Sequence, residues 1–333
     1  MAVQRFMWRA CYEALAKRVS TPDWAFMNYG YAPASVDVGM LPLRPSDEPD
    51  RLCIQLYSHA IDSCDLRDSD VLEVGSGRGG GASYISRYLQ PRSMTGMDFS
   101  QEAVDLCNRH RLAPGLAFVC GDTQSMPFPA SSFDAVVNIE SSHCYESMDN
   151  FLAEVCRVLR PGGRFFFADL RNLDGVDTLR EQFKACGLTV EKETDITTNV
   201  LTALRLDNAR KLELIDALIP RVFRRPFRVF AGIAGTRNYA GLESATLRYL
   251  SAQLAKRVPH RPEWRRTQGP APQNGRLARR GRGEAVELEL GFTRRTAIRN
   301  GAAFVTSLQI QRRDCVRMVE DHFRRSRSVT VPE

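Results

Sequence analysis

A glycine-rich turn within residues 71–81 is the first feature of the sequence that could bind a ligand. The run VLEVGSGRGGG leads from an apolar strand through Gly75, Ser76, Gly77 and Gly79 into a helical stretch. The backbone N–H groups of such a turn face a ligand at a helix N-terminus with no Cβ in the way. The glycines also fit the GxGxxG spacing shared by several cofactor sites, so the turn alone predicts a nucleotide-like ligand and no more.

Two acidic residues lie at or just beyond the ends of the next two strands that the sequence predicts, at 94–98 and 116–120. They could bind the sugar and the base of such a ligand. Asp98, followed by Phe99, is placed to accept hydrogen bonds from the ribose hydroxyls of either NAD or S-adenosylmethionine. Asp122, followed by Thr123, lies in the run GDTQSMPF at 121–128. An acid there can accept from the exocyclic amine of adenine while the apolar Met-Pro-Phe neighbours flank the ring. This second placement favours S-adenosylmethionine as the cofactor.

His143 and Glu140 are the residues expected to take part in the reaction. They lie in NIESSHCY at 138–145, after the fourth predicted strand and at the sheet edge where ligands of such folds bind. Methyl transfer from a sulfonium is a direct displacement, which needs alignment and, for a hydroxyl acceptor, a base. His143 can take that proton, and Glu140 is expected to orient or charge the site and to contact the cofactor. The alternative for His143 is a packed, hydrogen-bonded loop residue.

Five short apolar runs predict the strands that position these residues. Amphipathic helical stretches separate the runs, which predicts an α/β fold with a doubly wound, mostly parallel sheet. The runs are Val71–Gly75, Met94–Asp98, Leu116–Cys120, Phe133–Ile139 and Arg164–Asp169. A helix is predicted after Glu146, and the RPGG run at 160–163 is expected to end it because proline cannot continue a helix.

The rest of the chain is less regular. Residues 1–66 are predicted to be helical, with an extended, proline-containing interruption at 29–49. Beyond the core, 188–197 predicts a strand, 200–219 a helix, and 247–255 either of the two. The expected organisation is an N-terminal helical segment over the cofactor at 1–66, a cofactor-binding core at 67–170, the remaining sheet with a substrate cap at 171–256, and a flexible, arginine-rich extension at 257–333.

The net charge of +7 comes from the C-terminal extension. Residues 257–333 hold 17 Arg, no Lys and 8 acidic residues, which gives +9 and leaves −2 for the rest of the chain. The first part, 257–283, has eight Pro or Gly and no apolar pattern, which predicts a flexible linker. Arginine-rich sequence can bind nucleic-acid phosphates, but this part has only Trp264 as an aromatic and no RNA-binding motif. Nucleic acid is therefore a less favoured partner.

The composition excludes several protein classes. The nine cysteines are scattered with no CxxC pair, which predicts neither a disulfide framework nor a metal site. No stretch supplies the ~20 apolar residues of a spanning helix, and the N-terminus lacks the apolar core of an export signal. The expectation is a reduced, cytoplasmic protein with no membrane span.

The ordered set of motifs resembles the class I S-adenosylmethionine-dependent methyltransferases. The matching features are ExGxGxG at 73–79, the acid Asp98, GDxxxxPF at 121–128, FDAVV at 133–137 and LRPGG at 159–163. The resemblance implies a Rossmann-like fold and S-adenosylmethionine as cofactor, with Glu73 near its positive methionine end. A carboxylate in a buried strand is otherwise costly unless it is paired.

A closer resemblance covers residues 24–256. It is to the mycobacterial phthiotriolone and phenolphthiodiolone dimycocerosate methyltransferases and to the teleocidin-type C-methyltransferases of actinobacteria. The runs that carry it are AFMNYGYA at 25–32, LPLRPSDEPDR at 41–51, QLY at 55–57, GSGRGGGASY at 75–84, NIESSHCY at 138–145 and FADLR at 167–171. It places Tyr29 and Tyr57 over the cofactor, although both also suit ordinary packing.

Two kinds of chemistry remain open under this resemblance. The lipid enzymes imply methylation of a hydroxyl on a large hydrophobic lipid or natural product of secondary metabolism. The teleocidin type implies C-methylation of a prenyl double bond, with or without ring closure, and such a route prefers aromatic walls. A third reading is a cofactor-binding module whose arginine tail binds nucleic acid. The stretch 222–233, with phenylalanines among arginines, could form a lid on an apolar substrate, an ordinary amphipathic helix or a contact in a homo-oligomer.

Overall fold

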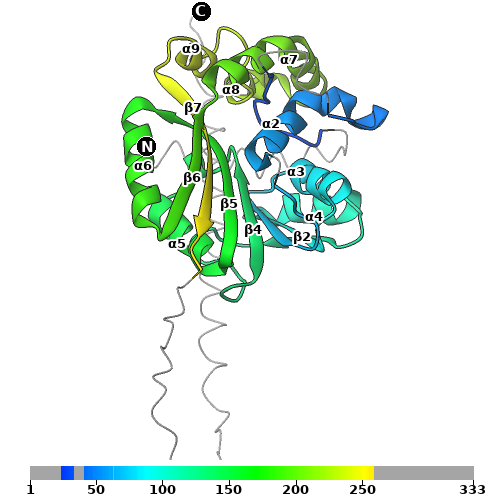
Figure 1. The fold of residues 1–333 in the computed structure, drawn as a ribbon. Helices are drawn as coiled ribbons and strands as arrows, with labels where there is room; N and C mark the ends of the chain where they lie inside the picture. Colours follow the sequence, from blue (N-terminus) through cyan, green and yellow to red (C-terminus); the bar gives the residue numbers. More distant parts are fainter. Residues whose placement is uncertain (1–23, 34–40, 63, 259–333) are drawn as a thin grey trace, which may run out of the picture. The chain divides into compact units, whose positions relative to one another are not determined.

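A seven-stranded sheet lies at the centre of the computed structural model, which describes residues 24–33, 41–62 and 64–258 (Figure 1). The strand order is β3-β2-β1-β4-β5-β7-β6, and β7 runs antiparallel to both of its neighbours while the other strands are parallel. The strands are β1 (Asp70–Val74), β2 (Ser93–Asp98), β3 (Leu116–Cys120), β4 (Phe133–Ile139), β5 (Leu159–Asn172), β6 (Leu188–Asp195) and β7 (Leu247–Lys256). The predicted α/β fold with a doubly wound, mostly parallel sheet is confirmed.

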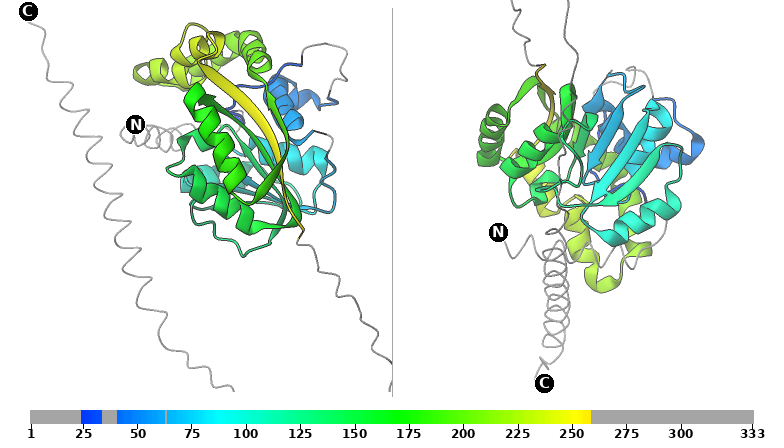
Figure 2. Two further views of the ribbon diagram at one scale, coloured as in Figure 1. Left: turned by 60° about the vertical axis from the view of Figure 1, so that its left-hand side comes forward. Right: turned by 90° about the horizontal axis from the view of Figure 1, so that it is seen from below.

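Helices cover both faces of this sheet (Figure 2). One face carries α2 (Arg51–Ile61), α3 (Gly80–Tyr84) and α4 (Gln101–His110), and the other carries α5 (Met148–Val158) and α6 (Leu173–Ala185). The short turns of helix are η1 (Pro45–Asp50), η2 (Ile85–Leu89) and η3 (Ser142–Cys144). In β5, Phe165 and Phe167 pack toward α5 and α6, whereas Phe166 and Ala168 pack toward α2. All four are fully buried, because successive side chains of a strand point to opposite faces of the sheet.

Three further helices form a cap beyond the carboxyl ends of the parallel strands (Figure 1). They are α7 (Thr197–Leu218), α8 (Arg221–Phe230) and α9 (Arg237–Glu243), which the chain inserts between β6 and β7. Ile215, Ile219, Phe227 and Ile233 give the cap a small apolar core, against which Trp24 packs. The cap therefore lies over the sheet edge at which ligands of open α/β folds bind.

β5 begins five residues earlier than the sequence predicts. The expected start is Arg164, but pairing with β4 begins at Leu159 and resumes at Arg164 after an irregularity that accommodates the Pro-Gly-Gly run. Gly162 there has a φ of +85°, a value that favours glycine. Helix α5 accordingly ends at Val158, just before RPGG, and starts after the N-cap Ser147.

The segment 247–255, for which the sequence allowed a helix or a strand, forms β7. Tyr249 in this strand is fully buried between β5 and β6. The predicted strand at 188–197 ends early, at Asp195, and α7 starts at Thr197 instead of residue 200. The Asp195 carboxylate accepts the Thr197 N–H at 2.9 Å, which starts the helix at this point.

Residues 24–33, here called the N-terminal strap, are extended. The helical prediction is therefore wrong for residues 24–28, whereas the extended interruption predicted from residue 29 agrees with the structure at 29–33. The strap is extended because its backbone groups bond to other elements: Tyr31 N–H donates to the Leu52 carbonyl at 2.9 Å, and Ala32 N–H to the Asn199 carbonyl at 3.2 Å. The predicted interruption also ends sooner, since η1 already begins at Pro45. Residues 1–23 lie outside the described residues.

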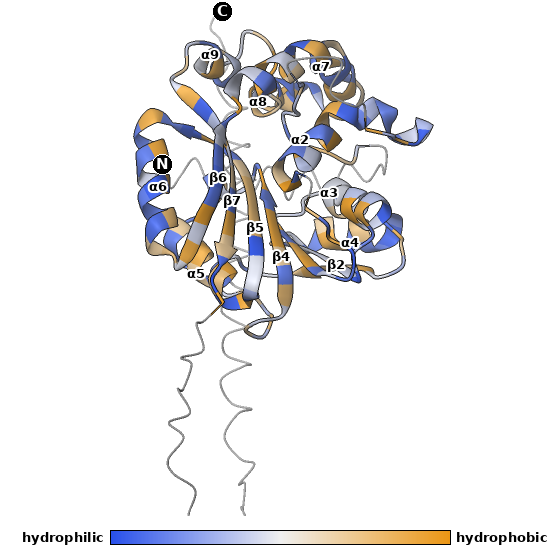
Figure 3. Ribbon diagram, viewed as in Figure 1, coloured by the Kyte–Doolittle hydropathy of each residue, from blue (hydrophilic) through white to orange (hydrophobic). Residues whose placement is uncertain are grey.

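The helices of the described part are amphipathic or polar (Figure 3). Among them no helix combines the length and the apolar character needed to cross a membrane. The described residues belong to one unit, Met1–Glu263. The arginine-rich extension lies outside them except for residues 257 and 258, so its predicted flexibility stays a prediction.

Candidate active site

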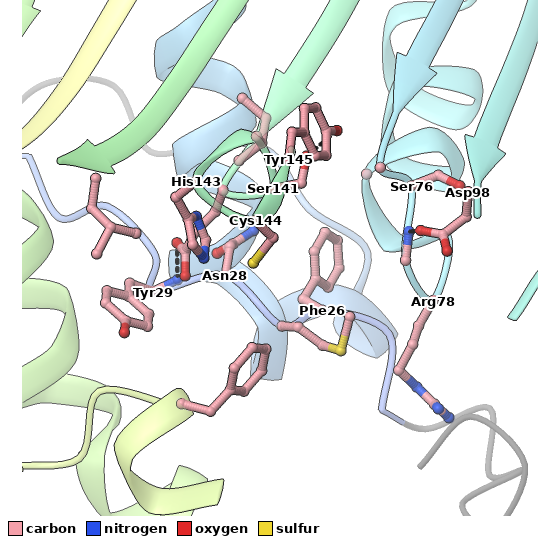
Figure 4. A pocket seen from close by; sticks show the side chains of 18 of the residues that line it. Phe26, Asn28, Tyr29, Ser76, Arg78, Asp98, Ser141, His143, Cys144 and Tyr145 are labelled. Atoms are coloured by element: carbon pink, nitrogen blue, oxygen red, sulfur yellow. Dashed lines mark hydrogen bonds between the residues drawn. The ribbon is translucent and has the colours of Figure 1, made fainter. Parts of the chain in front are cut away.

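A cavity of about 470 Å³ lies between the carboxyl ends of the strands, the N-terminal strap and the cap (Figure 4). The predicted site residues that line it are Tyr29, Tyr57, Gly75, Ser76, Gly77, Asp98, Phe99, Asp122, Thr123, Glu140 and His143. Figure 4 shows Ser76 and Asp98 on one side and His143 and Tyr29 on the other. The cavity thus has a side formed by the glycine-rich turn and a side that carries the candidate base.

The glycine-rich turn needs glycine for two reasons. Gly75 and Gly77 have φ values of +77° and +55°, in the left-handed region that other residues rarely adopt. In addition, a Cβ on Gly75 would collide with the Ser141 side chain and with the Tyr145 hydroxyl. The turn therefore keeps its backbone close to the strand ends and open to the cavity.

Asp98 lies at the end of β2, directly opposite this turn. Its Oδ2 accepts the Gly77 N–H at 2.9 Å and its Oδ1 accepts the Ser100 N–H at 3.0 Å. A carboxylate can accept about four hydrogen bonds, so Asp98 keeps capacity for ligand hydroxyls. Ser76 Oγ is buried at the cavity with no hydrogen-bond partner in the described part of the chain, and a polar group of a ligand would satisfy it. These residues fit the ribose and amino-acid parts of S-adenosylmethionine.

Asp122 lines the cavity, but the apolar residues that follow it do not. Asp122 Oδ1 accepts the Gln124 N–H at 2.9 Å and turns the chain away from the cavity. Met126 is then buried in the core and Phe128 packs against that core. The expectation that these side chains flank the adenine ring is wrong; Phe99 is the aromatic side chain at this end of the cavity.

Glu73 and Gly79 lie behind the cavity wall and do not line it. Glu73 is 1% exposed, and its Oε1 accepts the hydroxyl hydrogen of Tyr57 at 2.6 Å. Burial raises the pKa of Glu73 to about 8, so this carboxyl is mostly neutral at pH 7. A Cβ on Gly79 would come within 2.9 Å of Cys107 and Phe118. Of the hydrogen-bonded pair Tyr57 and Glu73, it is Tyr57 that lines the cavity.

His143 is held by a carboxylate that sequence analysis missed. Its Nδ1 lies 2.7 Å from Asp169 Oδ1, and its backbone N–H donates to Asp169 Oδ2 at 2.8 Å. Asp169 is fully buried and also accepts from Ser142 Oγ at 2.6 Å, with Arg171 at 3.0 Å. A carboxylate accepts hydrogen bonds, so Nδ1 carries a proton, and Nε2 is the nitrogen that can take one from a substrate.

Burial and charge act in opposite directions on this pair. Burial alone would lower the pKa of His143, but the negative charge of Asp169 raises it well above its usual value. Burial would raise the pKa of Asp169, but His143 and Arg171 lower it below its usual value. The two side chains therefore form an ion pair at neutral pH, and only the fraction of His143 that has lost a proton can accept one at Nε2.

Glu140 links the N-terminal strap to β7 at the cavity. Its Oε2 accepts the Tyr29 N–H and the Tyr249 hydroxyl, each at 2.8 Å. Burial raises the pKa of Glu140 to about 7. Its φ of +48° is uncommon for a residue other than glycine, which indicates that the surrounding contacts determine its conformation. These contacts support the expected orienting role, exerted here on the strap.

Apolar side chains form much of the remaining wall. They are Phe26, Met27, Ile139, Leu170, Phe227, Phe230 and Leu247. Two of them come from the segment 222–233, so the residues expected to cover an apolar substrate do reach the cavity. Sequence analysis missed the others because an apolar residue of a cavity wall has the same sequence signal as one of the core. For Asp169 a signal existed: it is an acidic residue at the end of the predicted strand 164–169, beside the strand that leads to His143.

The sheet, its glycine-rich turn and the cavity at its carboxyl edge are arranged as in the class I S-adenosylmethionine-dependent methyltransferases. A protein family described as a methyltransferase domain matches residues 72–167. Among solved structures, the geranyl diphosphate C-methyltransferase of Streptomyces coelicolor has a TM-score of 0.52 at 16% identity and covers 74% of this chain and 98% of its own. The StiE O-MT has a TM-score of 0.54 at 18% identity, and the match covers 73% of this chain and 90% of the StiE chain. At these identities the similarity concerns the fold.

Sequence relatives specify the family. The phthiotriol/phenolphthiotriol dimycocerosates methyltransferase of Mycobacterium leprae is 39% identical over 251 residues, which are 75% of this chain and 92% of the relative. A fatty-acid O-methyltransferase of Mycolicibacterium smegmatis is 36% identical and covers 72% of this chain and 85% of its own. The chain belongs to the family of the phthiotriol/phenolphthiotriol dimycocerosates methyltransferases, and it is an enzyme.

Proposed function

We propose that this enzyme transfers a methyl group from S-adenosylmethionine to a hydroxyl of a large apolar lipid or natural product, with His143 as the general base. The observation that carries the proposal is the 2.7 Å contact between His143 Nδ1 and the buried Asp169, on the wall of an apolar cavity. The relatives named for a lipid and for a fatty-acid substrate support an apolar acceptor and, for the second, an oxygen.

The chain's residues would hold the cofactor through the glycine-rich turn. Asp98 would accept from its ribose hydroxyls, Ser76 would bond to its amino-acid part, and Asp122 would accept from its adenine amine. S-adenosylmethionine, when bound, supplies an electrophilic methyl group on a positively charged sulfur. Tyr57 of α2 would close this end against water, and Tyr29 of the strap would cover the cavity on the side of His143.

His143 would act on the acceptor from the opposite wall. Nε2 takes the hydroxyl proton as the oxygen becomes a nucleophile, and the Asp169 carboxylate stabilises the imidazolium that forms. Asp169 also fixes the ring, because it accepts hydrogen bonds from both the backbone and the side chain of His143. The apolar wall contributes by holding the acceptor in line with the methyl group.

C-methylation of a double bond is the second candidate, and the aromatic wall is the observation that favours it. Phe26, Phe227 and Phe230 line the cavity, and the faces of aromatic rings stabilise a developing carbocation. Such a route needs no base before methyl transfer, so His143 would serve only a later deprotonation.

The product of the reaction tests the proposal. Purified enzyme is incubated with apolar extracts and S-adenosylmethionine carrying a ¹³C-labelled methyl group, and the labelled product is isolated and examined by NMR. A label at a methoxy shift supports O-methylation. A label on a carbon-bound methyl group overturns it in favour of the second candidate.

His143→Ala tests the role of the base, with His110→Ala as the matched control. His110 is exposed at the end of α4 and does not line the cavity. We expect His143→Ala to lower kcat by ~10²- to 10⁴-fold, the range for a lost general base, with cofactor affinity unchanged by calorimetry. The His110 variant should match the parent. Full activity of the His143 variant would remove the assignment.

A further inference from the structure

Helix α8 has a basic surface on the outside of the cap, and this surface includes one exposed apolar side chain, Val222, here called the apolar tip. Arg221, Val222, Arg225 and Pro226 are all exposed, and Val222 has 78% of its surface exposed. In an α-helix these residues share one face, because positions separated by three or four residues lie side by side. An exposed valine side chain thus lies on the same face of the helix as two exposed arginines.

The charged residues of α8 itself are all arginines. Residues 217–242 contain five arginines and no acidic residue. Arg224 and Arg228 each lie 3.3 Å from Asp216, whereas Arg221 and Arg225 make no ion pair with any residue of the described part. The unpaired charges are therefore those of the outer face.

The opposite face of the same helix belongs to the substrate cavity. Phe227 is 7% exposed, and both Phe227 and Phe230 line the cavity wall. Arg237, the first residue of the neighbouring α9, also lines the cavity and is exposed, so the cavity reaches the surface next to α8. A ligand that enters here passes along the helix that carries the basic surface.

We propose that α8 docks this enzyme on an anionic lipid surface, with Arg221 and Arg225 on the headgroups and Val222 inserted between them. A basic amphipathic helix with apolar side chains binds the interface of an anionic bilayer by both charge and apolar burial. A nucleic acid would use the charge but would give Val222 no apolar surroundings, and an acidic protein would leave the adjacent opening of an apolar cavity without a role, so the lipid surface explains more of the observations. Docking would place the cavity mouth at the layer in which an apolar acceptor dissolves. The proposal concerns binding and holds whether the acceptor atom is oxygen or carbon.

Vesicle binding of the full chain tests the proposal. The probe is phosphatidylcholine vesicles with and without phosphatidylglycerol, and the bound fraction is measured by co-sedimentation. Arg221→Glu with Arg225→Glu is compared with a control, Arg109→Glu with Lys184→Glu, which makes the same charge change at exposed residues of α4 and α6. All of these proteins keep the arginine-rich extension, so its contribution is constant.

We expect the α8 variant to need at least about tenfold more anionic lipid for half-binding, because two attractive charges become repulsive. The control variant should bind nearly as the parent does. Hydrogen exchange of the parent provides an independent measurement: amides of 221–230 should be protected by the anionic vesicles and not by pure phosphatidylcholine. Equal losses in both variants, parent-like binding of the α8 variant, or unchanged exchange of α8 would each overturn the proposal.

Val222→Asp tests the apolar tip. It should reduce the binding that remains at high salt, where headgroup attraction is screened. Retention of all salt-resistant binding would show that Val222 is not inserted. Methyl transfer to an acceptor presented in detergent should be unaffected in the α8 variants, so failure of docking is distinguishable from failure of the proposed reaction.

Discussion

At the scale of single residues, the function of His143 depends on Asp169. The carboxylate holds the imidazole through Nδ1, and its charge sets the proton affinity of the ring. Because the base must be unprotonated to act, activity should rise with pH through the pKa of His143, which lies well above its usual value.

Asp169→Asn should move this pH dependence. The amide removes the negative charge that raises the pKa of His143, so the acid limb of kcat/KM against pH should shift to lower pH. The maximal rate should also fall by about 10²-fold, since the amide no longer stabilises the imidazolium. Ser142→Ala is the control, because it removes one hydrogen bond to Asp169 but no charge. An unmoved acid limb in the Asp169 variant would contradict this coupling.

The buried Glu73 carboxyl is expected to make the stability of the protein depend on pH. Its pKa is raised from 4.5 to about 8 in the folded protein, so folding favours the protonated carboxyl. The stability that this group contributes is therefore complete below about pH 4.5 and is lost as the pH rises toward 8. Glu73→Gln keeps an acceptor for the Tyr57 hydroxyl but has no proton to lose.

Melting temperatures of parent and Glu73→Gln protein, measured at intervals between about pH 5 and pH 8, test this expectation. The difference in Tm, variant minus parent, should increase with pH by several degrees. Other titrating groups are common to both proteins and cancel in the difference. A pH-independent difference would mean that Glu73 is ionised in the folded state.

At the scale of elements, the N-terminal strap decides how the cavity is closed. Hydrogen bonds to its backbone hold the strap in place: Arg78 Nε donates to the Trp24 carbonyl at 2.5 Å, and Lys211 Nζ donates to the Asn28 carbonyl at 3.3 Å. The strap also needs Gly30, whose φ is +86° and whose Cβ, if present, would meet Leu52 at 3.2 Å.

Gly30→Ala is therefore expected to displace the strap. Gly235→Ala is the matched control, because Gly235 has a similar φ of +80° but nothing within 4 Å of a Cβ. In both variants the free energy of unfolding should fall by about 1 kcal/mol, because alanine is strained in the left-handed region. Only the Gly30→Ala variant should lose more stability than this. Calorimetry should also show that it binds S-adenosylmethionine several-fold more weakly. Equal effects of the two substitutions would show that the strap tolerates the shift.

At the scale of the whole molecule, the sheet is completed close to the start of the arginine-rich extension. β7 ends at Lys256, whose Nζ donates to the Cys156 and Leu159 carbonyls at 2.7 Å each. Arg257 still bonds to Thr189 at 2.8 Å. The contacts that anchor the last strand thus include residues up to 257.

A chain that ends after Val258 should accordingly keep the melting temperature and the methyl-transfer rate of the full protein. Every cavity residue and every strand in the described part of the chain precedes this point. Thermal unfolding and single-turnover transfer with labelled cofactor are the measurements. A truncated protein that unfolds early or loses cofactor binding would mean that the extension is part of the folded core. A cut after Leu254, which removes the anchoring Lys256, should destabilise the sheet.

The sequence by itself determined the parallel strands of the core, the helices between them, and the glycine-rich turn and strand-end acids that line one side of the cavity. Strand burial, the glycine-rich turn and the acids at strand ends are local patterns, and the parallel topology brings the strand ends to one edge. Met126 and Phe128 depart from these local patterns: a turn at Asp122 leads Met126 into the core and Phe128 against it, away from the cavity.

The tertiary structure alone decided which residues act together. Asp169 and His143 are 26 residues apart, and Glu140 is 109 residues from Tyr249, yet each pair is bonded. Their pKa values depend on burial and on neighbouring charges, which no local pattern records. The first half of the strap, residues 24–28, was wrongly predicted to be helical for the same reason, because its backbone carbonyls accept from distant side chains such as Arg78 and Lys211.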